Sequence, residues 1–167
     1  HIPLIALTGT NGKTTTKELT ATVLEEKFNV LHTQGNLNNH IGVPLSLLKL
    51  TNEHQLAVIE MGANHPGEIR ALALLADPDY GLITNVGKAH LEGFGSPENI
   101  LATKTELYEY IRRKGGKVFV NLDHPDLVEK SQGIQRIAYS SREGESPVLV
   151  SGRPAGNAFF LGVEWTD

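Results

Sequence analysis

The sequence predicts an α/β domain in which a mostly parallel β-sheet is covered by helices on both faces. Short apolar segments that suit buried strands alternate along the chain with segments whose apolar residues recur at helical spacing. A glycine turn also joins the first apolar segment directly to the first helical one, as in a βαβ unit. The chain has 167 residues, 40% of them hydrophobic, so we expect a single domain over 1–167 with a sizeable core.

The first four elements alternate as this fold class requires. Ile2–Leu7 is a short apolar run and is predicted to be a strand. Thr14–Phe28 has leucine and valine at helical spacing and is predicted to be a helix. A second strand is expected at Asn29–Thr33, and a short helix at Pro44–Leu50, because proline suits the first helical turn.

The middle of the chain repeats the alternation. Leu56–Met61 is apolar almost to its end and is predicted to be the third strand. Pro66–Leu75 places its apolar residues toward one face and is predicted to be a helix. Tyr80–Val86 is the fourth predicted strand. These strands and helices again favour parallel pairing in one sheet.

The next helix has the clearest start signal in the chain. Ser96 is a good N-cap, Pro97 suits the first turn, and Glu98 places a negative charge near the positive end of the helix dipole. We expect this helix to run to about Arg113 and to stop at Gly115-Gly116.

The pattern weakens after a fifth predicted strand, Lys117–Asn121. Three short strand-like segments follow, joined by Gly, Ser and Pro: Arg136–Ser140, Pro147–Ser151 and Phe159–Val163. We therefore expect a β-rich C-terminal edge built of short hairpin strands, and not another βαβ unit.

Composition excludes several classes of function. The net charge is −4 and the pI about 6.0, and the basic residues are spread along the chain, so no nucleic-acid-binding patch is visible. The absence of cysteine excludes disulfides and thiolate metal sites and suits a cytoplasmic protein. No apolar run approaches the roughly 20 residues that span a bilayer.

The segment from Thr8 to Thr14 (Thr-Gly-Thr-Asn-Gly-Lys-Thr) predicts a phosphate-binding loop. A glycine turn that opens a helix presents backbone N–H groups and the positive end of the helix dipole to an anion. Lys13 adds a positive charge for the phosphates, and the Thr14 hydroxyl can bind Mg²⁺. The candidate phosphate-binding residues are Gly9, Thr10, Asn11, Gly12, Lys13, Thr14 and Thr15.

This loop is a variant, because Leu7 stands where the general P-loop pattern has its first glycine. The alternative is an ordinary strand-to-helix turn. The preceding strand and the following helix favour nucleotide binding.

Two further polar residues are expected at the same edge of the sheet, because ligands bind at the carboxyl ends of parallel strands. Glu60 ends the third predicted strand and is a candidate Mg²⁺ ligand, the alternative being a solvated strand-end carboxylate. His90 lies in the glycine-rich loop Gly87–Gly95 after the fourth strand and is a candidate site residue. A surface histidine is the alternative.

The sequence pattern alone does not decide the roles of the other candidate residues. Lys104 has Glu106 and Glu109 nearby on its helix, which favours a solvated helical face. The loop Gln34–Pro44 holds three asparagines, whose amides either bind a ligand or build turns. Four histidines show no metal-binding spacing and are expected to be structural or exposed: His32, His54, His65 and His124.

Together these segments resemble the central ATPase domain of the Mur ligases, the ATP-dependent enzymes that build the peptide stem of peptidoglycan. The resemblance rests on the phosphate loop, whose family form also accounts for Leu7, and extends from Ile5 to about Asp126. The more specific motifs are Gly35–Pro44, Ile59–Asn64 with Gly67–Ile69, and Ala89–Ser96. In combination they are similar to the type that adds D-alanyl-D-alanine to UDP-N-acetylmuramoyl-tripeptide.

The resemblance implies a role for each candidate. Residues 9–15 would hold the ATP phosphates, with Lys13 as a catalytic charge and Thr14 on Mg²⁺. Glu60 would bind Mg²⁺ and His90 a second Mg²⁺. Lys104 matches the family's carbamylated lysine, whose carbamate helps to hold the second ion, so the resemblance overrides the interpretation from the pattern. Asn36 and Asn39 fall in a loop similar to the family's substrate-facing segment.

The implied reaction forms an acyl phosphate from the tripeptide and ATP, which the amine of D-alanyl-D-alanine then attacks. The family has three domains, so the resemblance implies that an N-terminal UDP-substrate domain and a C-terminal domain are absent here. His1 is the first residue, and we expect a monomeric fragment of a longer protein that is inactive on its own.

Three other functions stay open. One is a ligase of the same superfamily with a different acceptor. Another is a non-catalytic nucleotide-binding switch, for which the predicted metal ligands would be superfluous. The third is an interaction module in which the glycine loop is only structural.

Overall fold

The computed structural model describes residues 1–87, 94–142, 149–154 and 161–166, the last two ranges as backbone only. Six strands form one parallel sheet in the order β2-β3-β1-β4-β5-β6. Their bounds are Leu4–Thr8 (β1), Val30–His32 (β2), Leu56–Glu60 (β3), Tyr80–Ile83 (β4), Lys117–Asn121 (β5) and Gln135–Tyr139 (β6). This confirms the predicted parallel sheet.

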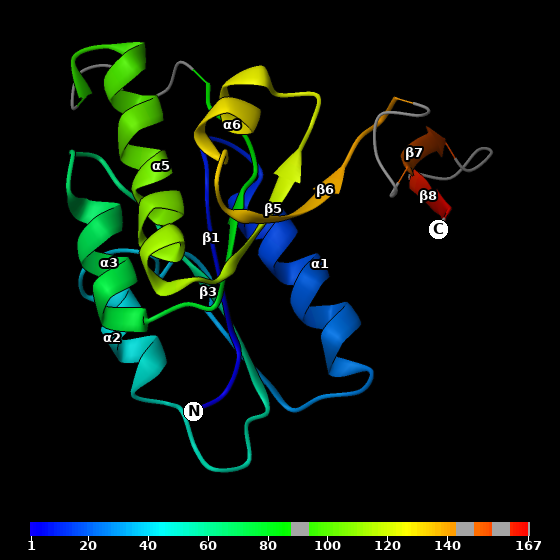
Figure 1. Ribbon diagram of the computed structural model, residues 1–167. Coiled ribbons are helices and arrows are strands. Elements are labelled where there is room, and N and C mark those ends of the chain that lie inside the picture. The colour runs from blue at the N-terminus through cyan, green and yellow to red at the C-terminus, as the bar shows by residue number, and fades with distance from the viewer. Residues whose placement is uncertain (88–93, 143–148, 155–160, 167) are drawn as a thin grey trace.

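Helices cover both faces of the sheet, as predicted. They span Lys13–Glu25 (α1), Gly42–Leu47 (α2), Glu68–Ala76 (α3), Pro97–Lys114 (α5) and Pro125–Lys130 (α6). Figure 1 shows α1 on one side of the sheet and α2, α3 and α5 on the other. None of the helices in the described ranges is long and apolar enough to cross a membrane.

Two apolar clusters hold these layers together. The larger one lies between the sheet and the layer of α2, α3 and α5, and includes Ile59, Ile69 and Leu107, each 0% exposed. The smaller one lies under α1, where Leu7 and Val58 of the sheet pack with partly buried neighbours. Burying side chains of this size stabilises the fold by roughly 1.5–3 kcal/mol each.

The register of the strands brings the candidate site residues to one edge of the sheet. Leu7 of β1 pairs with Glu60 of β3, and Thr8 pairs with Ile83 of β4. The loop that follows β1 therefore starts between the carboxyl ends of β3 and β4. The expected convergence of Glu60 with the phosphate loop at this edge is confirmed.

The prediction for the region after Asp123 is partly wrong. Strands β5 and β6 pair in parallel and α6 connects them, so this segment is another βαβ unit. The helix was missed because it has only six residues, although Pro125 at its first turn is a start signal. Strand β6 has a mixed polar pattern because it lies at the edge of the sheet, where solvent reaches it.

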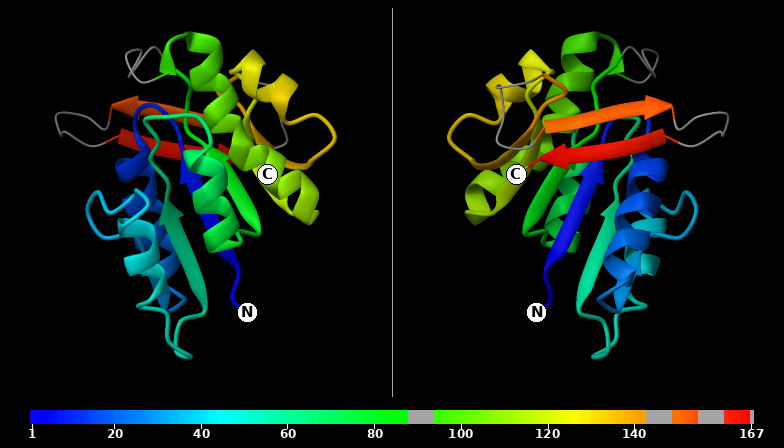
Figure 2. Two further views of the ribbon diagram at one scale, coloured as in Figure 1. Left: turned by 90° about the vertical axis from the view of Figure 1, so that its left-hand side faces the viewer. Right: turned by 90° about the vertical axis from the view of Figure 1, so that its right-hand side faces the viewer.

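The last two predicted strands exist with shifted bounds. Strands β7 (Leu149–Pro154) and β8 (Leu161–Thr166) form a separate antiparallel two-stranded sheet, which Figure 2 shows as an orange and a red arrow side by side. The expected β-rich C-terminal edge is therefore confirmed for this pair.

Candidate functional site

The phosphate loop depends on Gly9, because no other residue fits its conformation. Gly9 has φ 146°, a value that L side chains rarely adopt, and a Cβ there would collide with the Thr84 hydroxyl oxygen. Beyond Gly9 the loop is tied to the end of β4. The Asn11 carbonyl accepts hydrogen bonds from the Thr84 hydroxyl at 2.7 Å and from the Asn85 amide at 3.0 Å.

The loop leaves the start of α1 open to a ligand. Gly12, with φ 75°, is the N-cap residue, and no side-chain hydrogen bond caps the helix there. The first N–H groups of α1 and the positive end of its dipole are therefore available to an anion. Lys13 is half-buried and its Nζ donates to the Thr10 carbonyl at 3.0 Å, which holds the ammonium group over the loop.

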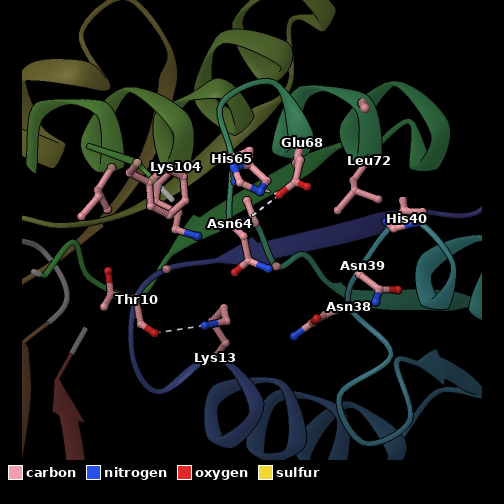
Figure 3. Close-up of a pocket in the computed structure, with 16 residues that line it drawn as sticks. Thr10, Lys13, Asn38, Asn39, His40, Asn64, His65, Glu68, Leu72 and Lys104 are labelled. Carbon is pink, nitrogen blue, oxygen red and sulfur yellow. Dashed lines mark hydrogen bonds between the residues drawn. The ribbon is translucent and has the colours of Figure 1, made fainter. Parts of the chain in front are cut away.

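A cavity of about 380 Å³ opens beside this loop. Its walls come from the phosphate loop, the β2–α2 loop, the β3–α3 loop and helices α3 and α5. Figure 3 shows Lys13 facing this space from the phosphate loop and Lys104 facing it from α5. The polar side chains that line it are Thr10, Lys13, Asn38, Asn39, His40, Asn64, His65, Glu68 and Lys104.

Glu60 is fully buried at the end of β3, so the interpretation as a solvated carboxylate is wrong. Its Oε1 accepts a hydrogen bond from the Asn38 side-chain amide at 2.7 Å. Its Oε2 has no hydrogen-bond partner among the described residues. A buried oxygen without a partner is unusual in a folded protein, and a cation at Oε2 would complete its contacts.

Lys104 is only 3% exposed, so the interpretation as part of a solvated helical face is also wrong. Burial, together with the positive charge of nearby Lys13, lowers the pKa of Lys104 to about 8. The ammonium group lies 5.7 Å from the centre of the Phe94 ring. The neighbouring Glu106 points elsewhere, because its carboxylate accepts the backbone N–H groups of Gly67 and Arg70 at the start of α3.

The structure therefore brings together some of the predicted site residues and leaves others apart. Gly9, Thr10, Lys13, Asn39 and Lys104 line the cavity. His90 falls outside the described residues. The predicted residues that do not line the cavity are Asn11, Gly12, Thr14, Thr15, Asn36 and Glu60, of which Glu60 is joined to its wall through Asn38.

Four polar residues that line the cavity were not singled out from the sequence, namely Asn38, His40, Asn64 and Glu68. Asn38 contacts Glu60, whereas Asn39 uses its side-chain oxygen to accept the N–H groups of Ile41 and Gly42 at the start of α2. Nothing in a run of asparagines indicates which one turns inward. Glu68 also lines the cavity: burial opposes its ionisation, but backbone N–H groups of Asn64 and His65 lower its pKa overall.

His65 is exposed, as expected, but it also lines the cavity. Across the described residues, no group of three or more His, Asp or Glu side chains is placed to hold a metal ion.

Comparison with known proteins matches the chain to one family. Residues 7–152 match the model of the Mur ligase middle domain. The UDP-N-acetylmuramoyl-tripeptide–D-alanyl-D-alanine ligase of Haemophilus influenzae is 41% identical over 163 residues, which cover 94% of this chain and 35% of that protein. The enzyme of the same name from Escherichia coli is 47% identical over 123 residues, covering 74% of this chain and 27% of that protein.

A solved structure has the same fold. The MurF ligase from Thermotoga maritima, crystallised in complex with ADP, superimposes with a TM-score of 0.86 at 32% identity, covering 98% of this chain and 38% of that one. The chain therefore spans about a third of the length of the proteins it matches. It belongs to the Mur ligase family and corresponds to the middle domain of those enzymes.

Proposed function

We propose that this chain is the ATP-binding domain of a ligase that joins D-alanyl-D-alanine to UDP-N-acetylmuramoyl-tripeptide. The observation that supports this most directly is the cavity in which Lys13 and Lys104 face the same space beside the buried Glu60. The names of the relatives supply the substrates. Because those relatives are about three times as long, the rest of the reaction would need domains outside these 167 residues.

The phosphate loop would bind the triphosphate of ATP. The uncapped start of α1 offers backbone N–H groups, and Lys13 supplies a full positive charge at the cavity wall. ATP and a substrate carboxylate repel each other because both are anionic. Lys13 would reduce this repulsion and hold the γ-phosphate in place for attack.

The described residues fit a Mg²⁺ ion. Glu60 offers a buried oxygen without a partner among the described residues, and Thr14, an exposed residue at the first turn of α1, carries a hydroxyl. Oxygen donors of this kind suit Mg²⁺. When bound, the ion would neutralise charge on the phosphates during transfer.

The environment of Lys104 suits carbamylation. A primary amine attacks CO₂ only in its neutral form, and a pKa of about 8 leaves a sizeable neutral fraction near neutral pH. The product is an anionic carbamate, whose oxygens would serve a second Mg²⁺ together with His90. This role for Lys104 and His90 follows the family resemblance.

The proposed reaction proceeds in two steps. A carboxylate oxygen of the tripeptide attacks the γ-phosphorus, a new O–P bond forms, and the bond to ADP breaks. The amine of D-alanyl-D-alanine then attacks the acyl carbon, an amide C–N bond forms, and phosphate leaves as the amine loses its proton. Asn36 and Asn39 belong to a loop that would face the peptide substrate, and Asn39 does line the cavity.

Replacing Lys13 tests this proposal. In a complete ligase that contains this domain, Lys13→Ala should abolish ATP-dependent ligation, because the cavity loses the charge that faces the phosphates. Lys27→Ala is the matched control, since Lys27 is exposed and its ammonium group lies over the Phe28 ring. Lys27→Ala should keep full activity. More than a few per cent of activity in Lys13→Ala would refute the phosphate assignment.

A further inference from the structure

We infer that Asn38 is a positioning residue that orients the Glu60 carboxylate for the metal ion, an inference that rests on the proposed function. Glu60 is 0% exposed and could rotate within its pocket unless something fixed its plane. The Asn38 amide fixes one oxygen through a bond of 2.7 Å from Nδ2 to Oε1. The other oxygen, Oε2, has no hydrogen-bond partner among the described residues and is therefore free to bind a cation.

Asn38 is held in place by its backbone and by the glycine that follows β3. The Gly62 N–H donates to the Asn38 carbonyl at 2.7 Å. A Cβ at position 62 would lie 2.7 Å from the Asn38 side-chain oxygen, so only glycine leaves room for the amide in this orientation. The amide therefore presents its NH₂ group to Glu60 and its oxygen to Gly62.

The loop that contains Asn38 is also anchored to the helix of the phosphate loop. Lys17 lies one turn beyond Lys13 on α1 and is fully buried. Its ammonium group donates to the carbonyls of Thr33 at 2.6 Å and Gly35 at 3.1 Å. These bonds fix the start of the β2–α2 loop against α1.

Thr33, which Lys17 contacts, also binds the backbone of Glu60. The Thr33 hydroxyl accepts the backbone N–H of Glu60 at 3.0 Å. Asn38 and Glu60 therefore lie on a shared, hydrogen-bonded framework tied to the phosphate loop through Lys17. The orientation of the carboxylate is set before any ligand binds, which reduces the cost of forming the metal site.

The test is the Mg²⁺ dependence of ADP binding, measured by titration calorimetry on the 167-residue chain. In the wild type, Mg²⁺ should tighten ADP binding. In Asn38→Ala, this Mg²⁺-linked gain should fall about tenfold or more, because the removed partner no longer orients the ligand oxygen. Asn38→Leu keeps the side-chain volume and should show the same loss, which separates the effect from a packing defect.

A double-mutant comparison shows whether Asn38 acts through Glu60. Glu60→Gln should itself remove most of the Mg²⁺-linked gain, and adding Asn38→Ala to it should change nothing further. Tyr110→Phe is the control, because it removes a hydrogen bond of equal length, 2.7 Å, to the Asp77 carboxylate away from the cavity. This control should keep the wild-type dependence on Mg²⁺.

The outcomes distinguish the positioning role of Asn38 from the proposed metal site at Glu60. If Glu60→Gln weakens the Mg²⁺-linked gain but both Asn38 variants keep it, the positioning role is wrong and the metal site stands. Asn38 variants that lower thermal stability without changing the Mg²⁺-linked gain would also refute the positioning role. If neither ADP binding nor its Mg²⁺ dependence is seen in the wild type, or Glu60→Gln leaves the dependence intact, the proposed metal site itself is wrong.

Discussion

Three buried charged side chains differ in how completely their polar atoms are paired, and this separates residues that support the fold from residues of the site. Lys17 is saturated, with two carbonyl oxygens and the Glu18 carboxylate around its ammonium group. Glu60 has a partner for only one of its oxygens, and Lys104 has an aromatic ring near it but no hydrogen bond among the described residues. Buried charges are normally fully paired. Of the two incompletely paired ones, Lys104 lines the cavity and Glu60 is joined to its wall through Asn38, so a ligand in the cavity would lie next to both.

The cost of burying Lys104 gives a prediction for stability. Its pKa of about 8 lies below the ordinary value of 10.5, so the unfolded chain binds more protons than the folded one between these pH values. The penalty is therefore complete below about pH 8 and disappears as the pH rises toward 10.5. Lys104→Met should raise the free energy of unfolding by roughly 1–3 kcal/mol at pH 7.

Urea denaturation at pH 7 and pH 10, in CO₂-depleted buffer without Mg²⁺, measures this effect. The advantage of Lys104→Met over the wild type should be largest at pH 7 and should shrink at pH 10. A variant that is less stable than the wild type at pH 7 would show that the buried ammonium group is stabilised by something other than the groups described above.

The ends of a helix can be predicted from the sequence when the residues that cap it are close to those ends in the chain. Helix α5 begins and ends as predicted, with the Ser96 hydroxyl accepting the Asn99 N–H at 3.3 Å and Gly115 in a left-handed conformation. Helix α2 instead starts before Pro44, because the Asn39 side chain accepts the N–H groups that precede it. That contact depends on the path of the loop, which local pattern does not show.

The Ser96 cap gives a prediction for this helix. Ser96→Ala should lower the free energy of unfolding by about 1 kcal/mol, because one N–H at the start of α5 loses its partner. Ser96→Asp keeps an acceptor at the same position and should stay close to the wild type. Chemical denaturation of the three proteins checks this. An unchanged Ser96→Ala, or an equal loss in Ser96→Asp, would rule out the capping role.

In the whole molecule, the order in which the strands and helices are connected determines where the site lies. Helix α1 leads from β1 toward β2, whereas α5 leads from β4 in the opposite direction across the sheet. The phosphate loop lies at the point where these directions diverge, which is where open parallel sheets bind ligands. The sequence was enough to predict the parallel sheet and the edge at which polar residues meet.

Other features needed the three-dimensional structure. The contact of Asn38 with Glu60 joins two loops that are distant along the chain, and three neighbouring asparagines look equivalent in a sequence. The burial of Lys104 depends on how α5 packs against α3, with Glu106 turned toward the start of α3. Periodicity describes which side of a helix is polar, but it does not show which polar residue becomes enclosed.

The central claim is that this domain supplies the ATP site of a D-alanyl-D-alanine-adding ligase. The most direct measurement is ATP-dependent phosphate release by a complete ligase containing this domain, supplied with UDP-N-acetylmuramoyl-tripeptide with and without D-alanyl-D-alanine. We predict release that depends on the dipeptide and is matched by formation of the pentapeptide product. Release that is indifferent to the dipeptide would contradict the proposed acceptor, and no release at all would contradict the ligase chemistry itself.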